Sequence, residues 1–226
     1  MTLTEAPAAT FGHAHDLPPV AADKVPRLIE RMRAIVGPAG VLTSRAEMAV
    51  YECDGFTVEK NPPNVVVFPD TTEQVVEIVK ACAEFDVPFM ARGAGTSLAG
   101  GCVPVGGGVM IGTSRLKKIL EVNVRDRYAV VEAGVVNVWL TNQLKPLGYH
   151  YAPDPSSQGA CTLGGNVATN SGGPHTLKYG VTVNHILGVE MVLPDGQVVV
   201  VGGPAEDGPG FDLTGTIVGK IGRAHV

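Results

Sequence analysis

Apolar side chains recur at helical spacing in two segments of the first half of the chain. Residues 71–86 (TTEQVVEIVKACAEFD) open with a threonine that can cap a helix and then place apolar residues on one face. Residues 24–37 (KVPRLIERMRAIVG) end at a glycine, and their apolar positions share one face: Val25, Leu28, Ile29, Met32 and Ile35. Both segments are predicted to be amphipathic helices.

Short apolar runs flank the second helix. Residues 64–70 (NVVVFPD) form a strand that ends at Pro69, and residues 87–93 (VPFMARG) form another. A strand, a helix and a strand with short joints predict a crossover unit with two parallel strands. A glycine-rich stretch begins where the second strand ends, which is where ligands gather on such sheets.

From residue 109 the pattern changes to short β-rich runs separated by turns. One helix fits among them, at 137–148 (NVWLTNQLKPLG), with Asn137 as its cap, Gly148 as its end and Trp139 as a core or interface aromatic. The predicted strands are VMIG, ILEVNV, YAVVEAGV, ILGVEMVLPDG and QVVVVGG, with LPDG as the turn between the last two.

These patterns predict an α+β protein. A small βαβ-containing subdomain covers about residues 64–115, and a larger, mostly antiparallel β subdomain covers about 116–219. Residues 24–63 form a helical lead-in. Residues 1–23 are rich in Ala, Pro and Thr and are expected to be a disordered tail, in which the HAHD motif lacks the further ligands that a metal site needs.

The composition of the chain argues against several classes of function. The 226 residues include 29 glycines, only 17% are charged, and the net charge is −5. The acidic balance argues against a nucleic-acid surface, and no apolar run reaches the roughly 18 residues of a membrane span. Four cysteines without a CxxC pair predict free thiols in a reducing cytoplasm, and the N-terminus lacks the pattern of a secretory signal.

The glycine-rich stretch 91–101 (ARGAGTSLAGG) is interpreted as an anion cradle. It follows a buried strand and sets Thr96 and Ser97 beside Gly95, where successive backbone N–H groups can surround a phosphate. A surface loop is the simpler alternative. The Walker pattern is excluded because no lysine follows, and the Rossmann pattern is disfavoured because Leu98 stands where its third glycine belongs.

Residues 151–173 (YAPDPSSQGACTLGGNVATNSGG) form a second cluster of small and polar residues. This composition is expected to form neither a helix nor a strand, and it suits a backbone wrapped around a flat polar ligand. A long surface loop is again the alternative. Two such clusters in one small domain predict a large ligand with separated parts.

The two clusters, with HTLKYGVTVNHILGVEMVLPDG, GFDLTGTIVG and YECDGF, resemble the flavin-binding (PCMH-type) domain of the vanillyl-alcohol oxidase family. Within that family they are similar to glycolate oxidase flavin subunits and to FAD-linked D-lactate and D-2-hydroxyglutarate dehydrogenases. The resemblance runs from about residue 25 to 219. It implies FAD as cofactor and oxidation of glycolate or a D-2-hydroxy acid to the 2-oxo acid by hydride transfer.

The resemblance also implies which residues hold FAD. The first cluster falls on the family's pyrophosphate loop, and two segments of the second cluster lie along the flavin and near its ring. The implied cofactor-binding residues are Arg92, Gly93, Ala94, Gly95, Thr96, Ser97, Pro153, Asp154, Ser156, Ser157, Gly159, Gly164, Gly165, Ala168, Thr169, Asn170 and Ser171.

Some relatives attach the flavin covalently through a histidine in the first loop. Gly95 occupies that place here, so FAD is expected to be bound non-covalently. Cys161 does not match the tethering cysteine of other relatives and is expected to be a small buried thiol. His175 is expected to be structural, and no catalytic residue and no metal site are assigned.

Residues 220–226 (KIGRAHV) depart from the family pattern, which continues after Gly219 with Ser-Glu-Gly-Thr. They match the translation of a common sequencing adaptor, so we expect them to be non-native and the fragment alone to be inactive. The expected partners are a small 2-hydroxy acid and either partner subunits or a respiratory-chain acceptor. The expected location is the cytoplasm, with peripheral attachment to the inner membrane left open.

Two alternatives remain. The chain could be a stand-alone flavin-binding module without catalysis. It could also support another chemistry on the same domain, such as an alkyl-glycerone-phosphate synthase-like transfer, although the glycolate-oxidase-like YECDGF weighs weakly against this.

Overall fold

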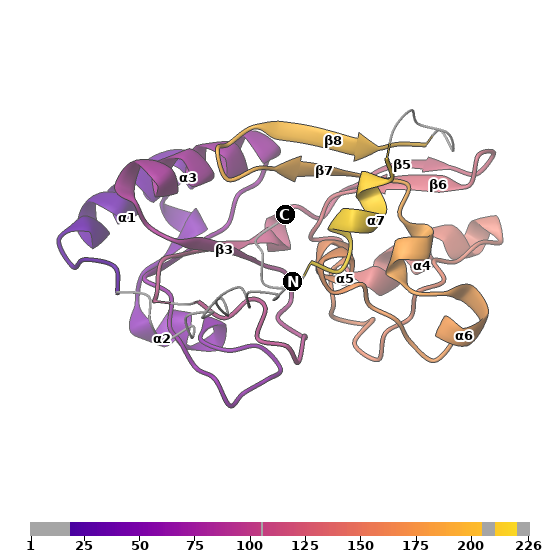
Figure 1. Ribbon diagram of the computed structural model, residues 1–226, viewed down its shortest axis with the longest axis horizontal. Coiled ribbons are helices and arrows are strands. Elements are labelled where there is room, and N and C mark those ends of the chain that lie inside the picture. Colours follow the sequence, from indigo (N-terminus) through magenta and orange to yellow (C-terminus); the bar gives the residue numbers. More distant parts are fainter. Residues whose placement is uncertain (1–18, 105, 205–210, 221–226) are drawn as a thin grey trace, which may run out of the picture.

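The computed structural model describes residues 19–104, 106–204 and 211–220 (Figure 1). Most of the expected N-terminal tail, with its HAHD motif, and residues 221–226 of the suspected non-native tail lie outside these ranges. The helices are α1 (Lys24–Val36), α2 (Arg45–Met48), α3 (Thr72–Phe85), α4 (Asn137–Leu144), α5 (Leu163–Thr169), α6 (Thr176–Tyr179) and α7 (Leu213–Ile217). The strands are β1 (Val41–Leu42), β2 (Val65–Val67), β3 (Phe89–Arg92), β4 (Val109–Gly112), β5 (Ile119–Asn123), β6 (Tyr128–Val131), β7 (Gly188–Val192) and β8 (Val198–Gly202).

The first body of the protein is a four-stranded sheet in the order β1-β2-β4-β3. Strand β4 runs parallel to both of its neighbours, and β1 is antiparallel to β2. The sequence correctly predicted that β2 and β3 are parallel strands joined by a helix. It placed VMIG in the same subdomain without predicting its partners: this segment is β4, which lies between β2 and β3 and is buried throughout its length.

Successive side chains along a strand point to opposite faces of this sheet, so the core is divided into two parts, one on each face. Val65 and Val67 pack with α1 and α3, whereas Val66 packs on the opposite face against Met48 and Met110. Full burial of such side chains stabilises the fold by about 1.5–3 kcal/mol each. The lead-in predicted to be only helical therefore also contributes β1 and covers the second face of the sheet.

Local signals place the two long helices where the sequence predicted them. Helix α1 ends before Gly37, which adopts a positive φ of 77°. Helix α3 begins after Thr71, whose Oγ1 accepts a hydrogen bond from the backbone N–H of Gln74, and it ends at Asp86 in the left-handed conformation. The end of α1 and both ends of α3 were readable because each carries a capping residue.

The second body contains two antiparallel hairpins and the short helices α4, α5 and α6 (Figure 1). The β5–β6 hairpin lies beside α4 and α5. The β7–β8 hairpin extends across the top of Figure 1 toward α3, where Thr72 donates a hydrogen bond to Glu190 at 2.9 Å and Val192 packs against the first core. This hairpin links the two bodies, and the proposed boundary near residue 115 stays a prediction.

Two expectations about the second body were wrong. The second cluster does contain a helix, α5, which begins after Thr162 and ends at Asn170 in the left-handed conformation. Its two glycines, each about 1 kcal/mol less favourable in a helix than alanine, concealed it. The cap of α4 is Val136 rather than Asn137. Of the two roles expected for Trp139, its 46% exposure excludes the core, and the role of an interface aromatic stays a prediction.

Candidate functional site

The first glycine cluster forms an open loop, residues 93–100, directly after β3. Gly95 has a φ of 67°, a conformation that a residue with a side chain rarely adopts. Among the described residues, the backbone N–H groups of residues 94–98 donate no hydrogen bond. Successive unpaired N–H groups on an accessible loop are what an anion-binding backbone nest requires.

The second cluster is ordered by turns and by α5. The two prolines of PDPSS are buried, and a turn at residues 156–160 follows, in which the Gln158 N–H donates to the Pro155 carbonyl at 2.8 Å. Ser156 and Gly159 are exposed on this turn. Thr162 then caps α5 by accepting a hydrogen bond from the Gly165 N–H at 3.2 Å.

The structure brings the two clusters together at Gly93. A Cβ at this position would lie inside the 3.0 Å that real side chains respect, against the hydroxyl of Thr162. The side chain of Thr113, at the end of β4, also donates to the Arg92 carbonyl at 3.4 Å. The loop after β3 and the start of α5 therefore lie side by side. That they contact two parts of one large ligand stays a prediction.

A second close approach fixes the position of α5. The Gly164 N–H donates to the Ala133 carbonyl at 2.8 Å, and a Cβ on Gly164 would lie 2.7 Å from the Ala133 Cβ. The Leu163 N–H donates to the Val135 carbonyl at 2.8 Å. The glycine is needed here because a side chain would prevent the helix from lying against the chain after β6. The N–H group of Gly164 is already used in this internal hydrogen bond.

A buried amide network joins the segments of the second cluster, and the sequence did not reveal it. Asn137 Nδ2 donates at 3.0 Å both to the Pro153 carbonyl and to Asn166 Oδ1. Asn166 Nδ2 donates to Ser171 Oγ at 3.2 Å, and Ser171 also bonds to the hydroxyl of Thr169. The sequence signal that could have revealed this network is the presence of Asn137 in α4 and Asn166 in α5, two asparagines within helices.

Asn170 also has a positioning contact. Its Oδ1 accepts a hydrogen bond from the Val183 N–H at 2.9 Å, and its own backbone has a φ of 48°. Together with the hydroxyls of Thr169 and Ser171, its side chain holds the end of α5 in place. The structure thus uses these three polar side chains for internal contacts, while Ala168 is partly exposed beside them.

Arg92 makes contacts away from the open face of the glycine loop. The side chain is 7% exposed, and its guanidinium donates to the Cys53 carbonyl at 2.7 Å and to the Val50 carbonyl at 3.3 Å. It lies 5.4 Å from the centroid of the Tyr51 ring. The positive charge that the sequence placed in the anion cradle is therefore directed into residues 50–53.

Asp154 is paired with His175 at the surface of the second cluster. Asp154 Oδ2 and His175 Nδ1 are in hydrogen-bond contact, and the His175 N–H donates to Asp154 Oδ1 at 3.4 Å. The hydrogen bond from His175 holds the pKa of Asp154 below its ordinary value. The pair joins the PDPSS segment to the loop before α6.

Two of the four cysteines, Cys82 and Cys161, are buried thiols. Cys161 is buried, and its thiol lies 3.6 Å from Asn166 Oδ1, which confirms the prediction of a small buried thiol. Burial raises the pKa of Cys82 to about 12. Among the described residues, no group of three or more His, Cys, Asp or Glu side chains is arranged to hold a metal ion.

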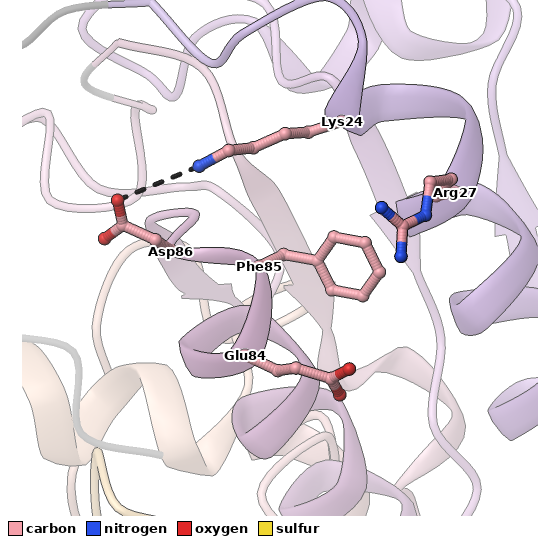
Figure 2. Close-up of a pocket in the computed structure, with 5 residues that line it drawn as sticks. All are labelled: Lys24, Arg27, Glu84, Phe85 and Asp86. Carbon is pink, nitrogen blue, oxygen red and sulfur yellow. Dashed lines mark ion pairs between the residues drawn. The ribbon is translucent and has the colours of Figure 1, made fainter.

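One hollow of the surface lies away from both glycine clusters. A pocket of about 230 Å³ is formed where the start of α1 meets the end of α3 (Figure 2), and it contains no residue of either glycine cluster. Lys24 pairs with Asp86 at 3.8 Å, and the Arg27 guanidinium lies 5.6 Å from the Phe85 ring centroid. Charges of both signs line this pocket, so it is not a candidate for the anion site.

Residues 63–202 match the family described as FAD binding domain. The chain belongs to this family. It is 44% identical over 186 residues to glycolate oxidase subunit GlcD of Escherichia coli K12, covering 82% of this chain and 37% of that protein. It is 35% identical over 210 residues to a D-lactate dehydrogenase of Anaerostipes hadrus, covering 89% of this chain and 42% of that protein.

Solved structures confirm the fold. An alkyldihydroxyacetonephosphate synthase superposes with a TM-score of 0.78 at 25% identity, covering 98% of this chain and 42% of the other. The chain therefore spans about two fifths of the length of the relatives it matches. Among the described residues, no helix has both the length and the apolar character needed to cross a bilayer.

The two clusters fit the cofactor of this family. FAD carries an anionic pyrophosphate between two flat ring systems, and the unpaired N–H groups of residues 94–98 suit the anionic part. The contact at Gly93 then sets the start of α5 beside that loop. FAD is the cofactor of this domain.

Proposed function

We propose that this chain is the FAD-binding part of an oxidoreductase that converts glycolate or a D-2-hydroxy acid, such as D-lactate, to the 2-oxo acid. Membership of the FAD-binding domain family carries the proposal. The named activities of its relatives, glycolate oxidase and D-lactate dehydrogenase, support the substrate class. The α-carbon of the hydroxy acid would lose a hydride and its hydroxyl a proton, and bound FAD would supply the two-electron acceptor.

The residues of this chain would bind and orient the cofactor. In the proposed arrangement, the N–H groups of residues 94–98 hold the pyrophosphate and the accessible parts of Pro153–Gly159 lie along the flavin. The end of α5, from Ala168 to Ser171, approaches the ring, with its polar side chains held by the internal contacts described above. The residue that accepts the hydroxyl proton is not assigned.

FAD would be held without a covalent bond, because Gly95 offers no side chain at the attachment position of the covalent relatives. Acid precipitation of the purified protein tests this point. Yellow colour should remain in the supernatant, and a yellow pellet would contradict non-covalent binding. Partner subunits or a respiratory-chain acceptor would reoxidise the flavin, and the proposed location is the cytoplasm, with or without peripheral attachment to the inner membrane.

Anaerobic mixing of the FAD-loaded full-length protein with glycolate, D-lactate and L-lactate tests the function. Loss of the visible absorption of oxidised flavin with glycolate or D-lactate, and not with L-lactate, is the expected result. FAD binding without bleaching by any hydroxy acid would instead favour a flavin-binding module without catalysis. Sequencing the source DNA across the codons for Gly219 and Lys220 shows which reading frame to express.

A further inference from the structure

Residues 50–56, which lie outside the region matched by the FAD-binding family, contact the glycine loop directly. A Cβ added to Gly55 would lie 2.8 Å from the Ser97 carbonyl oxygen and 3.3 Å from that of Thr96. The backbone of this segment is therefore packed against the carbonyl side of the loop.

Two buried charged side chains connect the segment and the loop in opposite directions. From the loop side, the Arg92 guanidinium donates to the carbonyls of Val50 and Cys53. From the segment side, Asp54, which is 5% exposed, accepts a hydrogen bond from the Gly100 N–H at 2.9 Å through Oδ2. Its Oδ1 accepts another from the Phe56 N–H at 2.8 Å. Charged groups are rarely buried without such partners, and hydrogen bonds to them are the strong ones.

The two connections hold opposite ends of the loop. Arg92 is the last residue of β3 and precedes the loop, whereas Gly100 is its last residue. Gly95 lies directly over the Arg92 guanidinium, with no room for a side chain between them. Fixing both ends of a glycine-rich segment removes conformational freedom that would otherwise be lost on ligand binding.

We propose that Arg92 and Asp54 are positioning residues that clamp residues 50–56 to the glycine loop, so that its unpaired N–H groups are prearranged for the FAD pyrophosphate. The proposal rests on the assignment of this loop to the pyrophosphate and is independent of the substrate. It gives Arg92 a role different from direct contact with the phosphates, and it makes the YECDGF segment a part of the cofactor site.

Arg92→Met and Asp54→Asn test the clamp. The methionine keeps the apolar stem beside Tyr51 and removes the donors, whereas the asparagine keeps the shape of Asp54 and can turn an NH₂ group toward the Gly100 N–H. Arg115→Met is the matched control, because Arg115 donates to the Ala39 carbonyl at 2.8 Å and pairs with Asp70 without touching the loop. Arg92→Lys is a milder variant should the methionine variant fail to fold.

The first measurement is the backbone ¹⁵N order parameters of residues 93–100 in the FAD-free chain, which report the order of N–H groups that make no hydrogen bond. Arg92→Met and Asp54→Asn should lower these order parameters, with Arg92→Lys giving a smaller decrease and Arg115→Met none. The second measurement is affinity for FAD and for riboflavin. The two clamp variants should bind FAD at least about tenfold more weakly, while riboflavin, which lacks phosphates, should bind with unchanged affinity.

Three results would overturn the proposal. Unchanged loop order parameters in both clamp variants would remove the positioning role, and this comparison decides the matter even where FAD affinity is too low to measure. Weaker FAD binding of Arg92→Met with unchanged loop order parameters would mean that Arg92 contacts the cofactor. Equal losses for FAD and riboflavin would mean that the loop does not hold the pyrophosphate. Absence of hydroxy-acid turnover would count against the proposed function only.

Discussion

Removal of the Asn137 side chain should destabilise the second body of the protein by an amount that the structure allows us to work out. Asn137 is 1% exposed, and its Nδ2 donates two hydrogen bonds of 3.0 Å. Asn137→Ala leaves the Pro153 carbonyl and Asn166 Oδ1 without these donors. Each net hydrogen bond contributes about 1 kcal/mol, and each stranded buried acceptor costs about 1–3 kcal/mol.

One term offsets this loss. The Oδ1 atom of Asn137 has no partner among the described residues, so its removal recovers part of the cost of burying it. The thiol of Cys161 also stays near Asn166 Oδ1. We therefore expect a net loss of about 2 kcal/mol in the free energy of unfolding, which lowers the melting temperature by roughly 4–8 °C in a chain of this size.

Asn137→Asp makes the test sharper, because it keeps the shape and replaces the donor with an oxygen. That oxygen would face two acceptors in a buried site, and a single proton could satisfy only one of them. Asn137→Asp should be less stable than Asn137→Ala in urea unfolding followed by circular dichroism. Asn123→Ala, which removes a surface amide bonded to Asp126, is the control and should change stability little. An aspartate variant as stable as the unaltered chain would refute the role assigned to the network.

Three further predictions follow from single contacts. Gly93→Ala forces a methyl group against the threonine that caps α5 and should cost about 1–3 kcal/mol in thermal unfolding, whereas Gly159→Ala, with open space around it, should cost nothing. The raised pKa of Cys82 means that the unfolded chain ionises first, so stability should fall between about pH 9 and pH 12, and Cys82→Ala should lessen that slope in urea titrations. The lowered pKa of Asp154 means that its contribution to the stability of the fold is present above the ordinary pKa of 3.8 and is lost as the pH falls below it. In the His175→Ala variant the pKa of Asp154, measured by NMR titration, should return toward 3.8. An unchanged pKa would contradict the pairing.

Local patterns determined much of this protein. The long helices α1 and α3 carry their own apolar faces and terminal residues, and the strands of the two hairpins are short apolar runs separated by recognisable turns. The glycine loop was also identified from local sequence, because glycine is the residue expected where the backbone has a positive φ or lies close to a ligand. Gly95 does adopt a positive φ. Family motifs then added FAD, because they preserve these backbone requirements in a fixed order.

Tertiary structure decided what each polar side chain does. Asn137 has the residue type of a helix cap, yet packing turned it into the centre of a buried network, because the Pro153 carbonyl and Asn166 reach it only in the folded chain. Arg92 lies in a phosphate-binding motif, yet its guanidinium is directed toward carbonyls some forty residues earlier in the chain. The position of β4 between β2 and β3 was hidden likewise, since a short apolar run does not specify its partners. Sequence encodes the local preference of each residue, whereas the partner that satisfies a buried donor or acceptor exists only once distant segments have packed together.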